Sequence, residues 1–286
     1  MFRHIHFNFE SKAVSLHVMG KKNIFGLIGV LMLLVFNTSC NSYQKVLRST
    51  DFEYKRKMAK KYYNEGAYYK AIPLFEELMS VFKGTQDVEK LYYFYAYSHY
   101  GQDDYLLSAH YFKTFADTYP RSVYAEDAQF MTAFCYYKLS PKPSLEQTYT
   151  GKAIEYFQLF ANAYPNSDKV KRANQLMEQI RLKLETKAFQ SAELYFKVKS
   201  YKAAAAAFEN ILEDFADTQR QENLRFLIME SLFLLAENSV KTKQKERYEA
   251  AVDAYFNFID RFPKSNDLQK AEEMYQISSE KIETLQ

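Results

Sequence analysis

Apolar residues recur along this chain with the period of an α-helix in five separate segments. Each segment opens on a small residue, carries large apolar residues four and seven positions later, and has an aromatic residue at position eleven. These offsets fall on one face of an α-helix, so each segment is expected to form an amphipathic helix that buries this face. The small residues that open the segments are Ala71, Ser108, Ala153, Ala204 and Ala251.

The end of each segment carries signals for the end of one helix and the start of the next. Ser or Thr stands at position fourteen of every segment, and Pro stands at position twelve in three of them. Proline stops a helix and a hydroxyl is a favoured N-cap, so a second helix is expected to follow. Thr218 and Gln221 also have the spacing of a capping box. The pattern therefore predicts an all-α chain of paired helices.

The paired helices resemble tetratricopeptide repeats in their small and aromatic positions, for example Ala59, Tyr62, Gly66 and Tyr68 ahead of Ala71. The five opening residues are 37, 45, 51 and 47 positions apart, whereas plain tetratricopeptide repeats recur about every 34 residues. Three stretches are expected to contain the residues that exceed the length of a plain repeat. They are the loop-like residues 138–144, the polar residues 237–247 as a loop or extended helix ends, and residues 167–199 as one long helix without Gly or Pro.

These patterns predict a helical-repeat solenoid of five helix pairs, with the long helix bridging repeats three and four. Repeats one to three are expected in residues 51–166, and the bridging helix, leading into repeat four, in residues 167–199. Residues 200–286 are expected to contain repeats four and five and a capping helix.

The N-terminus has the three parts of a secretory signal, predicted over residues 1–39. Lys21 and Lys22 precede the apolar run Ile24 to Phe36, and small residues follow up to Cys40. A helix of 13 residues is about 20 Å long, too short for the roughly 30 Å hydrocarbon core of a bilayer. A cleaved signal is therefore favoured over a permanent span. Met19 is an alternative start of the chain.

The residues around Cys40 resemble the end of a bacterial lipoprotein signal. An ordinary signal with an incidental cysteine is the alternative, but Cys135 sits in an aromatic run and is expected to be buried and inert. The resemblance implies a covalent diacylglycerol and an N-acyl chain, such as palmitate, on Cys40, with residues 40–50 as a tether. No acidic residue occurs between Cys40 and Asp51. In such lipoproteins this favours the periplasmic face of the outer membrane.

The charge of the chain argues against a nucleic-acid partner. The formal net charge of +3 comes from residues 1–39, which hold four basic residues and one acidic residue; the rest of the chain has 34 of each. A neutral body offers no electrostatic attraction to phosphates.

No motif for catalysis or for a cofactor stands out, and we expect a binding protein rather than an enzyme. The sequence lacks a phosphate-binding glycine loop, a His-Glu-x-x-His, a Cys-x-x-Cys and a Gly-x-Ser-x-Gly motif. Only two histidines follow the signal, so a metal site is not expected. The basic run 241–247 is interpreted as a solvated loop, with acidic lipid or a partner as the alternative.

Aromatic residues on the first helices of the pairs are the candidate partner-binding positions. Residues 91–100 are aromatic on nearly every side, and Tyr92, Tyr95 and His99 form one helical stripe. Two interpretations carry equal weight: these side chains line a groove for a peptide, or they pack into neighbouring helices. The same two interpretations hold for Tyr62, Tyr136 and Tyr195.

The signal, Cys40, the repeats and the long helix together resemble the BamD family, the lipoproteins of the outer-membrane β-barrel assembly machinery. The most specific stretch runs from Leu182 through Lys187 and Tyr195 to Phe215, with its alanine and tyrosine spacing. Ala207 departs from the family, which often has Arg there.

This resemblance implies an adaptor that is anchored by lipid on the periplasmic side of the outer membrane. Its C-terminal repeats would bind a BamA-type barrel-forming subunit, and its N-terminal groove would receive C-terminal segments of unfolded outer-membrane proteins. The alternatives are another envelope lipoprotein scaffold, acting in glycan uptake or division, and an envelope hydrolase with a repeat fold.

Overall fold

The computed structural model describes residues 42–285, and all the regular structure in this range is helical. The chain divides into two compact units, one ending at Gln102 and the other beginning at Asp103. The expectation of an all-α fold is thereby confirmed, whereas the number of repeats stays a prediction. The signal and Cys40 lie outside the described residues.

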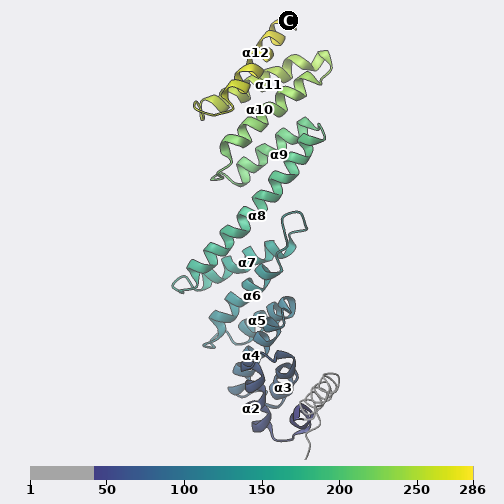
Figure 1. The fold of residues 1–286 in the computed structure, drawn as a ribbon. Helices are drawn as coiled ribbons and strands as arrows, with labels where there is room; N and C mark the ends of the chain where they lie inside the picture. Colours follow the sequence, from purple (N-terminus) through teal and green to yellow (C-terminus); the bar gives the residue numbers. More distant parts are fainter. Residues whose placement is uncertain (1–41, 286) are drawn as a thin grey trace, which may run out of the picture. The chain divides into compact units, whose positions relative to one another are not determined.

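The first unit contains a short helix over residues 42–48 and three longer helices (Figure 1). These are α2 (Phe52–Asn64), α3 (Tyr68–Val81) and α4 (Asp87–Gly101). The helices α2 and α3 pack against each other, as do α3 and α4. Asp51 caps α2, because its side chain accepts a hydrogen bond from the backbone N–H of Tyr54 at 2.9 Å.

The second unit is a succession of helices in which each packs against the next. They are α5 (Tyr105–Thr118), α6 (Ala125–Leu139), α7 (Thr148–Ala163), α8 (Val170–Lys197), α9 (Tyr201–Asp214), α10 (Gln221–Glu237), α11 (Lys241–Ile259) and α12 (Leu268–Thr284). With 28 residues, α8 is the long helix expected from the sequence, and it contacts both α7 and α9.

The five amphipathic segments form α3, α5, α7, α9 and α11. The residues at their positions zero, four and seven are all buried, with exposed fractions between 0 and 8%. The aromatic residue at position eleven lies at the helix end and is half-buried. Ala192, Ala204 and Phe208 illustrate the packing, because they share one core cluster of α8 and α9. This confirms the predicted buried face of the repeat.

The hydroxyl residues at position fourteen of four segments form hydrogen bonds in the turns between the helices. The side chains of Ser122, Ser167, Thr218 and Ser265 each accept a hydrogen bond from the backbone N–H two residues later. They therefore act at a turn that precedes the next helix. The capping box predicted for Thr218 and Gln221 is wrong, because the Gln221 amide donates to the carbonyl oxygen of Ala216 instead.

Two further expectations are corrected by the helix boundaries. The basic residues 241–247 are not a loop, because α11 begins at Lys241 and includes all of them. The irregular segment after α6 is longer than predicted, since α6 ends at Leu139 and α7 begins at Thr148. This loop is held by α8, because the Lys187 ammonium donates to the Leu145 carbonyl oxygen at 2.7 Å.

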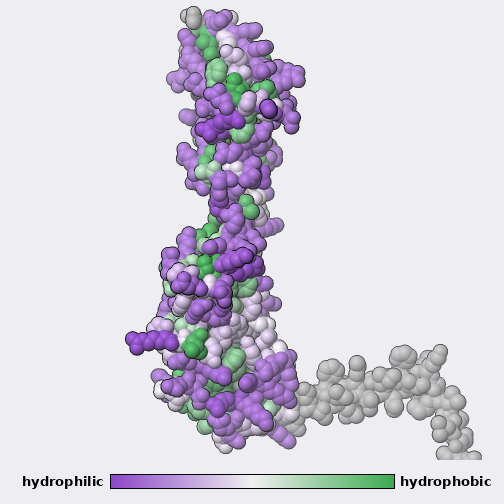
Figure 2. Space-filling view, turned by 90° about the vertical axis from the view of Figure 1, so that its left-hand side faces the viewer, coloured by the Kyte–Doolittle hydropathy of each residue, from purple (hydrophilic) through white to green (hydrophobic). Residues whose placement is uncertain are grey.

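The surface of the described residues is mostly hydrophilic on the face drawn in Figure 2, with hydrophobic residues scattered between polar ones. No described helix is both long and apolar enough to cross a membrane.

Candidate partner-binding grooves

The aromatic stripe predicted on α4 is largely buried. Tyr95 and His99 are 6% and 7% exposed, and Tyr92 is half-buried. The rings of Tyr95 and His99 meet edge to face at 4.8 Å between centroids, and Tyr92 meets Tyr95 in the same way at 6.5 Å. Between the two interpretations of this stripe, the burial of Tyr95 and His99 favours packing into the protein.

The other predicted tyrosines divide into buried and exposed positions. Tyr62 and Tyr136 are buried, at 7% and 9% exposed, whereas Tyr195 on α8 is 46% exposed. Burial is the main cause that raises the pKa of the Tyr136 hydroxyl, against the opposing effect of Lys152. Tyr62 and Tyr136 therefore have little surface to offer a partner directly.

Cys135 fits the expectation of an inert core thiol. Its side chain is fully buried and donates a hydrogen bond to the hydroxyl oxygen of Ser108 at 3.4 Å. Burial raises the pKa of the thiol to about 12, although the hydrogen bond with Ser108 acts in the opposite direction.

A groove of about 280 Å³ is formed by α5, α6 and α7, and we call it the α5–α7 groove. Lys113 and Asp117 of α5 lie on one wall and form an ion pair at 2.6 Å. Tyr156 and the 51%-exposed Leu159 belong to α7, and Thr132 of α6 also lines the groove. The charges on its walls cancel, and its contact surface is mainly aromatic and aliphatic.

Buried Tyr136 supports this groove from behind. Its ring stacks on the rings of Tyr156 and Tyr149, at centroid distances of 5.3 and 6.2 Å. The Lys152 ammonium lies 5.4 Å from the centre of the Tyr136 ring. Tyr136 therefore orients a groove residue, Tyr156, rather than facing the groove itself.

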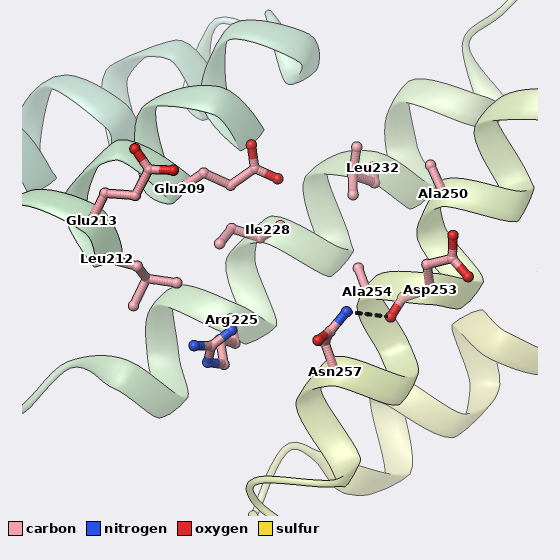
Figure 3. A pocket seen from close by; sticks show the side chains of 10 residues that line it. All are labelled: Glu209, Leu212, Glu213, Arg225, Ile228, Leu232, Ala250, Asp253, Ala254 and Asn257. Carbon is pink, nitrogen blue, oxygen red and sulfur yellow. Dashed lines mark hydrogen bonds between the residues drawn. The ribbon is translucent and has the colours of Figure 1, made fainter. Parts of the chain in front are cut away.

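A larger groove of about 560 Å³ lies between α9, α10 and α11, and we call it the α9–α11 groove (Figure 3). Three exposed carboxylates stand on its walls: Glu209 and Glu213 of α9, and Asp253 of α11. Arg225 of α10 points between these walls, near Leu212 and Ile228. With three acids and one arginine among its lining residues, this groove is negative.

Arg225 is a half-buried cation on the floor of this groove. Its Nε is buried and has no hydrogen-bond acceptor among the described residues. Burial lowers the pKa of the guanidinium, and the nearby Arg261 lowers it further. On the opposite wall, burial and then the charge of Glu213 raise the pKa of the Glu209 carboxyl. A basic side chain on a bound segment would neutralise the acids of the walls.

The two grooves use equivalent positions of the repeat. Lys113 and Asp117 follow Ser108 by five and nine residues, and Glu209 and Glu213 follow Ala204 by the same distances. At the floor, Gln129 and Thr132 follow Ser122 by seven and ten residues. Arg225 and Ile228 follow Thr218 at this same spacing.

Sequence reasoning missed these groove residues because it considered aromatic residues of the first helices only. The walls come from the outward faces of the second helices, which carry no aromatic run. A signal was nevertheless present, because the residues five and nine positions after the small opening residue change charge from one repeat to another.

Comparison with known proteins identifies a family to which this chain is similar. The model of the YfiO family, described as outer membrane lipoprotein, matches residues 53–246. The chain belongs to this family. A relative in Aquifex aeolicus (strain VF5), a putative outer membrane protein assembly factor BamD, is 24% identical over 193 residues. The match covers 67% of this chain and 62% of the relative. The BamD-family resemblance seen in the sequence is thereby confirmed.

Membership in the YfiO family points to association with the outer membrane and to a scaffold without catalysis. The family match contains both grooves except for the α11 wall beyond residue 246. The Ala207 side chain packs against the core cluster that contains Ala192, Ala204 and Phe208.

Solved structures with related shapes are tetratricopeptide proteins. The TPR2AB-domain:pHSP90 complex of yeast Sti1 has a TM-score of 0.37 and 12% identity, covering 80% of this chain and 98% of that one. The TPR domain of P58(IPK) has a TM-score of 0.39 and 13% identity, covering 85% and 68%.

Proposed function

We propose that this protein is a lipid-anchored, non-enzymatic adaptor of outer-membrane protein assembly on the periplasmic face of the outer membrane. The observation that carries the proposal is a YfiO-family match over residues 53–246 on a fold with two grooves at equivalent repeat positions. An acyl-modified Cys40 would hold the adaptor at the membrane, since two or more acyl chains anchor a protein stably.

The α9–α11 groove suits a folded partner with a basic face, which we assign to a BamA-type barrel-forming subunit. Its carboxylates lie on the rim, where charge guides association, and the guanidinium group of Arg225 lines the groove as a donor for a carbonyl oxygen of the partner. Arg225 thus supplies the directional contact and the acids supply the attraction.

The α5–α7 groove suits extended segments of unfolded outer-membrane proteins. Strands of a membrane barrel alternate apolar and polar side chains and carry aromatic girdles. Leu159 and Tyr156 offer apolar and aromatic contacts, and the Lys113–Asp117 pair leaves no net charge to repel either sign. Side chains of varied sequence can therefore be accepted.

Site-specific photo-crosslinking in cells tests both assignments. A photoreactive amino acid at Asn257 is expected to capture the barrel-forming subunit, and one at Leu159 is expected to capture newly exported barrel precursors. Leu194, which is 60% exposed on α8 and lines neither groove, is the control position. Affinity purification of the lipidated protein should recover the same subunit.

Absence of a barrel-assembly subunit from the Asn257 crosslink and from the purified complex would overturn the proposal. Recovery of a glycan-uptake or division complex instead would identify a different envelope scaffold. Turnover of peptidoglycan or of a peptide by the purified protein would contradict the non-enzymatic assignment.

A further inference from the structure

The chain becomes ordered helix almost immediately after Cys40. Residues 42–48 are helical, and Val46 is only 1% exposed. The Tyr43 hydroxyl donates a hydrogen bond to the carbonyl oxygen of Lys70 at 3.3 Å, and the Tyr43 ring meets that of Tyr62 edge to face at 5.6 Å. The start of the predicted tether is therefore docked on α2 and α3.

Three tyrosine rings surround one lysine at this docking point, and we call this group the tyrosine–lysine patch. The Lys70 ammonium lies 5.8 Å from the ring centre of Tyr43 and 5.5 Å from those of Tyr62 and Tyr69. Tyr69 is 62% exposed, the largest exposed fraction among the aromatic residues of the described chain. Packing within the first unit therefore leaves most of the Tyr69 ring uncovered.

The charged residues of the 42–48 helix are both basic, and Glu65, in the turn between α2 and α3, pairs with Lys61 at 3.9 Å. Lys45 and Arg48 are exposed on the 42–48 helix, and no acidic residue occurs between Cys40 and Asp51. Tyrosine rings favour the boundary between lipid headgroups and hydrocarbon, lysine side chains extend their ammonium group to water, and basic residues are attracted to anionic lipid. The combination fits a phospholipid surface.

Covalent geometry limits how far this patch can lie from an acylated Cys40. Tyr43 is three residues beyond Cys40, and three residues span at most about 10 Å even when fully extended. Because the lipid on Cys40 enters the bilayer, Tyr43 lies within about 10 Å of the membrane surface, and the rings in contact with it are within reach of the headgroup layer.

We propose that the tyrosine–lysine patch rests in the phospholipid headgroup layer and orients the first unit on the membrane. The inference depends on the lipidation of Cys40 that the proposed function includes. The acyl chains hold the protein at the bilayer, and the patch sets which end of the α2–α3 pair faces it. The turn between α2 and α3 is the membrane-facing end.

Fluorescence quenching in vesicles tests this orientation. The lipidated full chain carrying Tyr69→Cys is labelled with an environment-sensitive fluorophore and reconstituted into phosphatidylethanolamine and phosphatidylglycerol vesicles containing nitroxide-labelled lipid. Labelling is selective, because acylated Cys40 has no free thiol, Cys135 is fully buried, and burial raises the pKa of the Cys135 thiol to about 12. Lys45→Cys supplies a second site on the 42–48 helix.

Val81→Cys is the matched control, because Val81 is 45% exposed at the other end of α3. It lies about 18 Å from Tyr69 along the helix axis. We expect at least threefold stronger quenching at positions 69 and 45 than at 81. Equal quenching at the three positions, or stronger quenching at 81, overturns the proposed orientation.

A separate measurement distinguishes this result from failure of the proposed function. Mass spectrometry of the N-terminal peptide and flotation with vesicles report lipidation directly, and Cys40→Ser should abolish both signals. An unacylated wild-type chain would contradict the lipid anchor and the orientation together. An acylated chain that floats but shows no quenching at position 69 would contradict the orientation alone.

Discussion

The α5–α7 and α8–α11 regions are built on the same repeat but differ in the charge of their grooves. Five and nine positions after the small residue that opens each segment stand Lys113 and Asp117 in α5, and Glu209 and Glu213 in α9. Lys113 and Asp117 form an ion pair. Glu209 and Glu213 carry the same charge, and the charge of Glu213 adds to burial in raising the pKa of the Glu209 carboxyl. A shared backbone therefore presents two different binding surfaces.

The two regions also share a device that ties each helix pair together. The Ser167 hydroxyl donates to the Glu126 carboxylate, and the Thr218 hydroxyl donates to the Glu185 carboxylate, both at 2.6 Å. The residue two positions after each hydroxyl residue is basic. Its charged group lies over the aromatic ring of the residue four positions after the glutamate. These pairs are Lys169 over Phe130, and Arg220 over Phe189. The residues that make these contacts are different from those that line the two grooves.

The largest expected effect is on the stability of the fold and comes from removing the buried carboxylate of Glu185. Glu185 is 5% exposed and also pairs with Arg220 at 3.4 Å. Glu185→Ala leaves the buried Thr218 hydroxyl without its acceptor, and we expect a loss of about 2 to 3 kcal/mol in the free energy of unfolding. Urea denaturation of the mature chain measures the loss. The equivalent change, Glu126→Ala, should cost about 1 kcal/mol because Glu126 is only half-buried. Equal losses would show that burial does not distinguish the two regions.

The next effect is on partner binding through the α9–α11 groove. Reversing two rim charges with Glu209→Lys and Glu213→Lys should weaken binding of the barrel-forming subunit about tenfold at low salt. Surface plasmon resonance at two salt concentrations measures the change, which should shrink as salt screens the rim. Lys113→Glu, at the equivalent position of the α5–α7 groove, is the control and should leave this affinity unchanged. A similar loss from Lys113→Glu would contradict separate partners for the two grooves.

A smaller effect is expected from the ring that lines the α5–α7 groove. Tyr156→Ala should weaken binding of an unfolded barrel segment about fivefold, since a lost aromatic contact is worth about 1 kcal/mol. Fluorescence anisotropy with a labelled peptide measures it. Tyr149→Ala removes the other ring stacked on Tyr136 without changing a lining residue of the groove. If Tyr156→Ala and Tyr149→Ala lose the same affinity, the Tyr156 ring stabilises the fold rather than contacting the bound segment.

The smallest effect concerns the pH dependence of stability. Because burial and then Glu213 raise the pKa of Glu209, the folded chain binds this proton more strongly than the unfolded chain. The ionised carboxylate therefore costs stability at neutral pH, and the cost disappears as the pH falls below the ordinary glutamate value of 4.5. Glu209→Gln should raise the thermal midpoint slightly at pH 7 and not at pH 4. A gain that is the same at both values would exclude this electrostatic origin.

Much of the fold could be predicted because burial follows the helical period residue by residue. Ala204, Phe208 and Ile211 are buried as expected. The absence of Gly and Pro in residues 167–199 predicted the long helix α8. The interpretation of residues 241–247 as a loop was wrong, whereas the alternative of extended helix ends is confirmed, because a basic run is compatible with either a solvated helix or a loop. Only contacts with the rest of the fold decide between them.

The candidate site could be predicted less well, for a reason that Tyr136 and Tyr156 show. Both are tyrosines on amphipathic helices, yet Tyr136 is buried behind the groove and Tyr156 lines it. A helical pattern tells which residues share a face but does not tell which neighbouring helix covers that face. Arg225 was missed for the same reason, since its burial arises from α9 and α11 together.

The sequence by itself determined the amphipathic helices, their buried positions and the family, because these depend on local periodicity and residue type. The tertiary structure decided which outward faces become groove walls, since a wall needs two helices and a floor from a third. It also decided that the aromatic stripe of α4 is mainly packed. Grooves are properties of helix neighbours, and neighbours are set by packing.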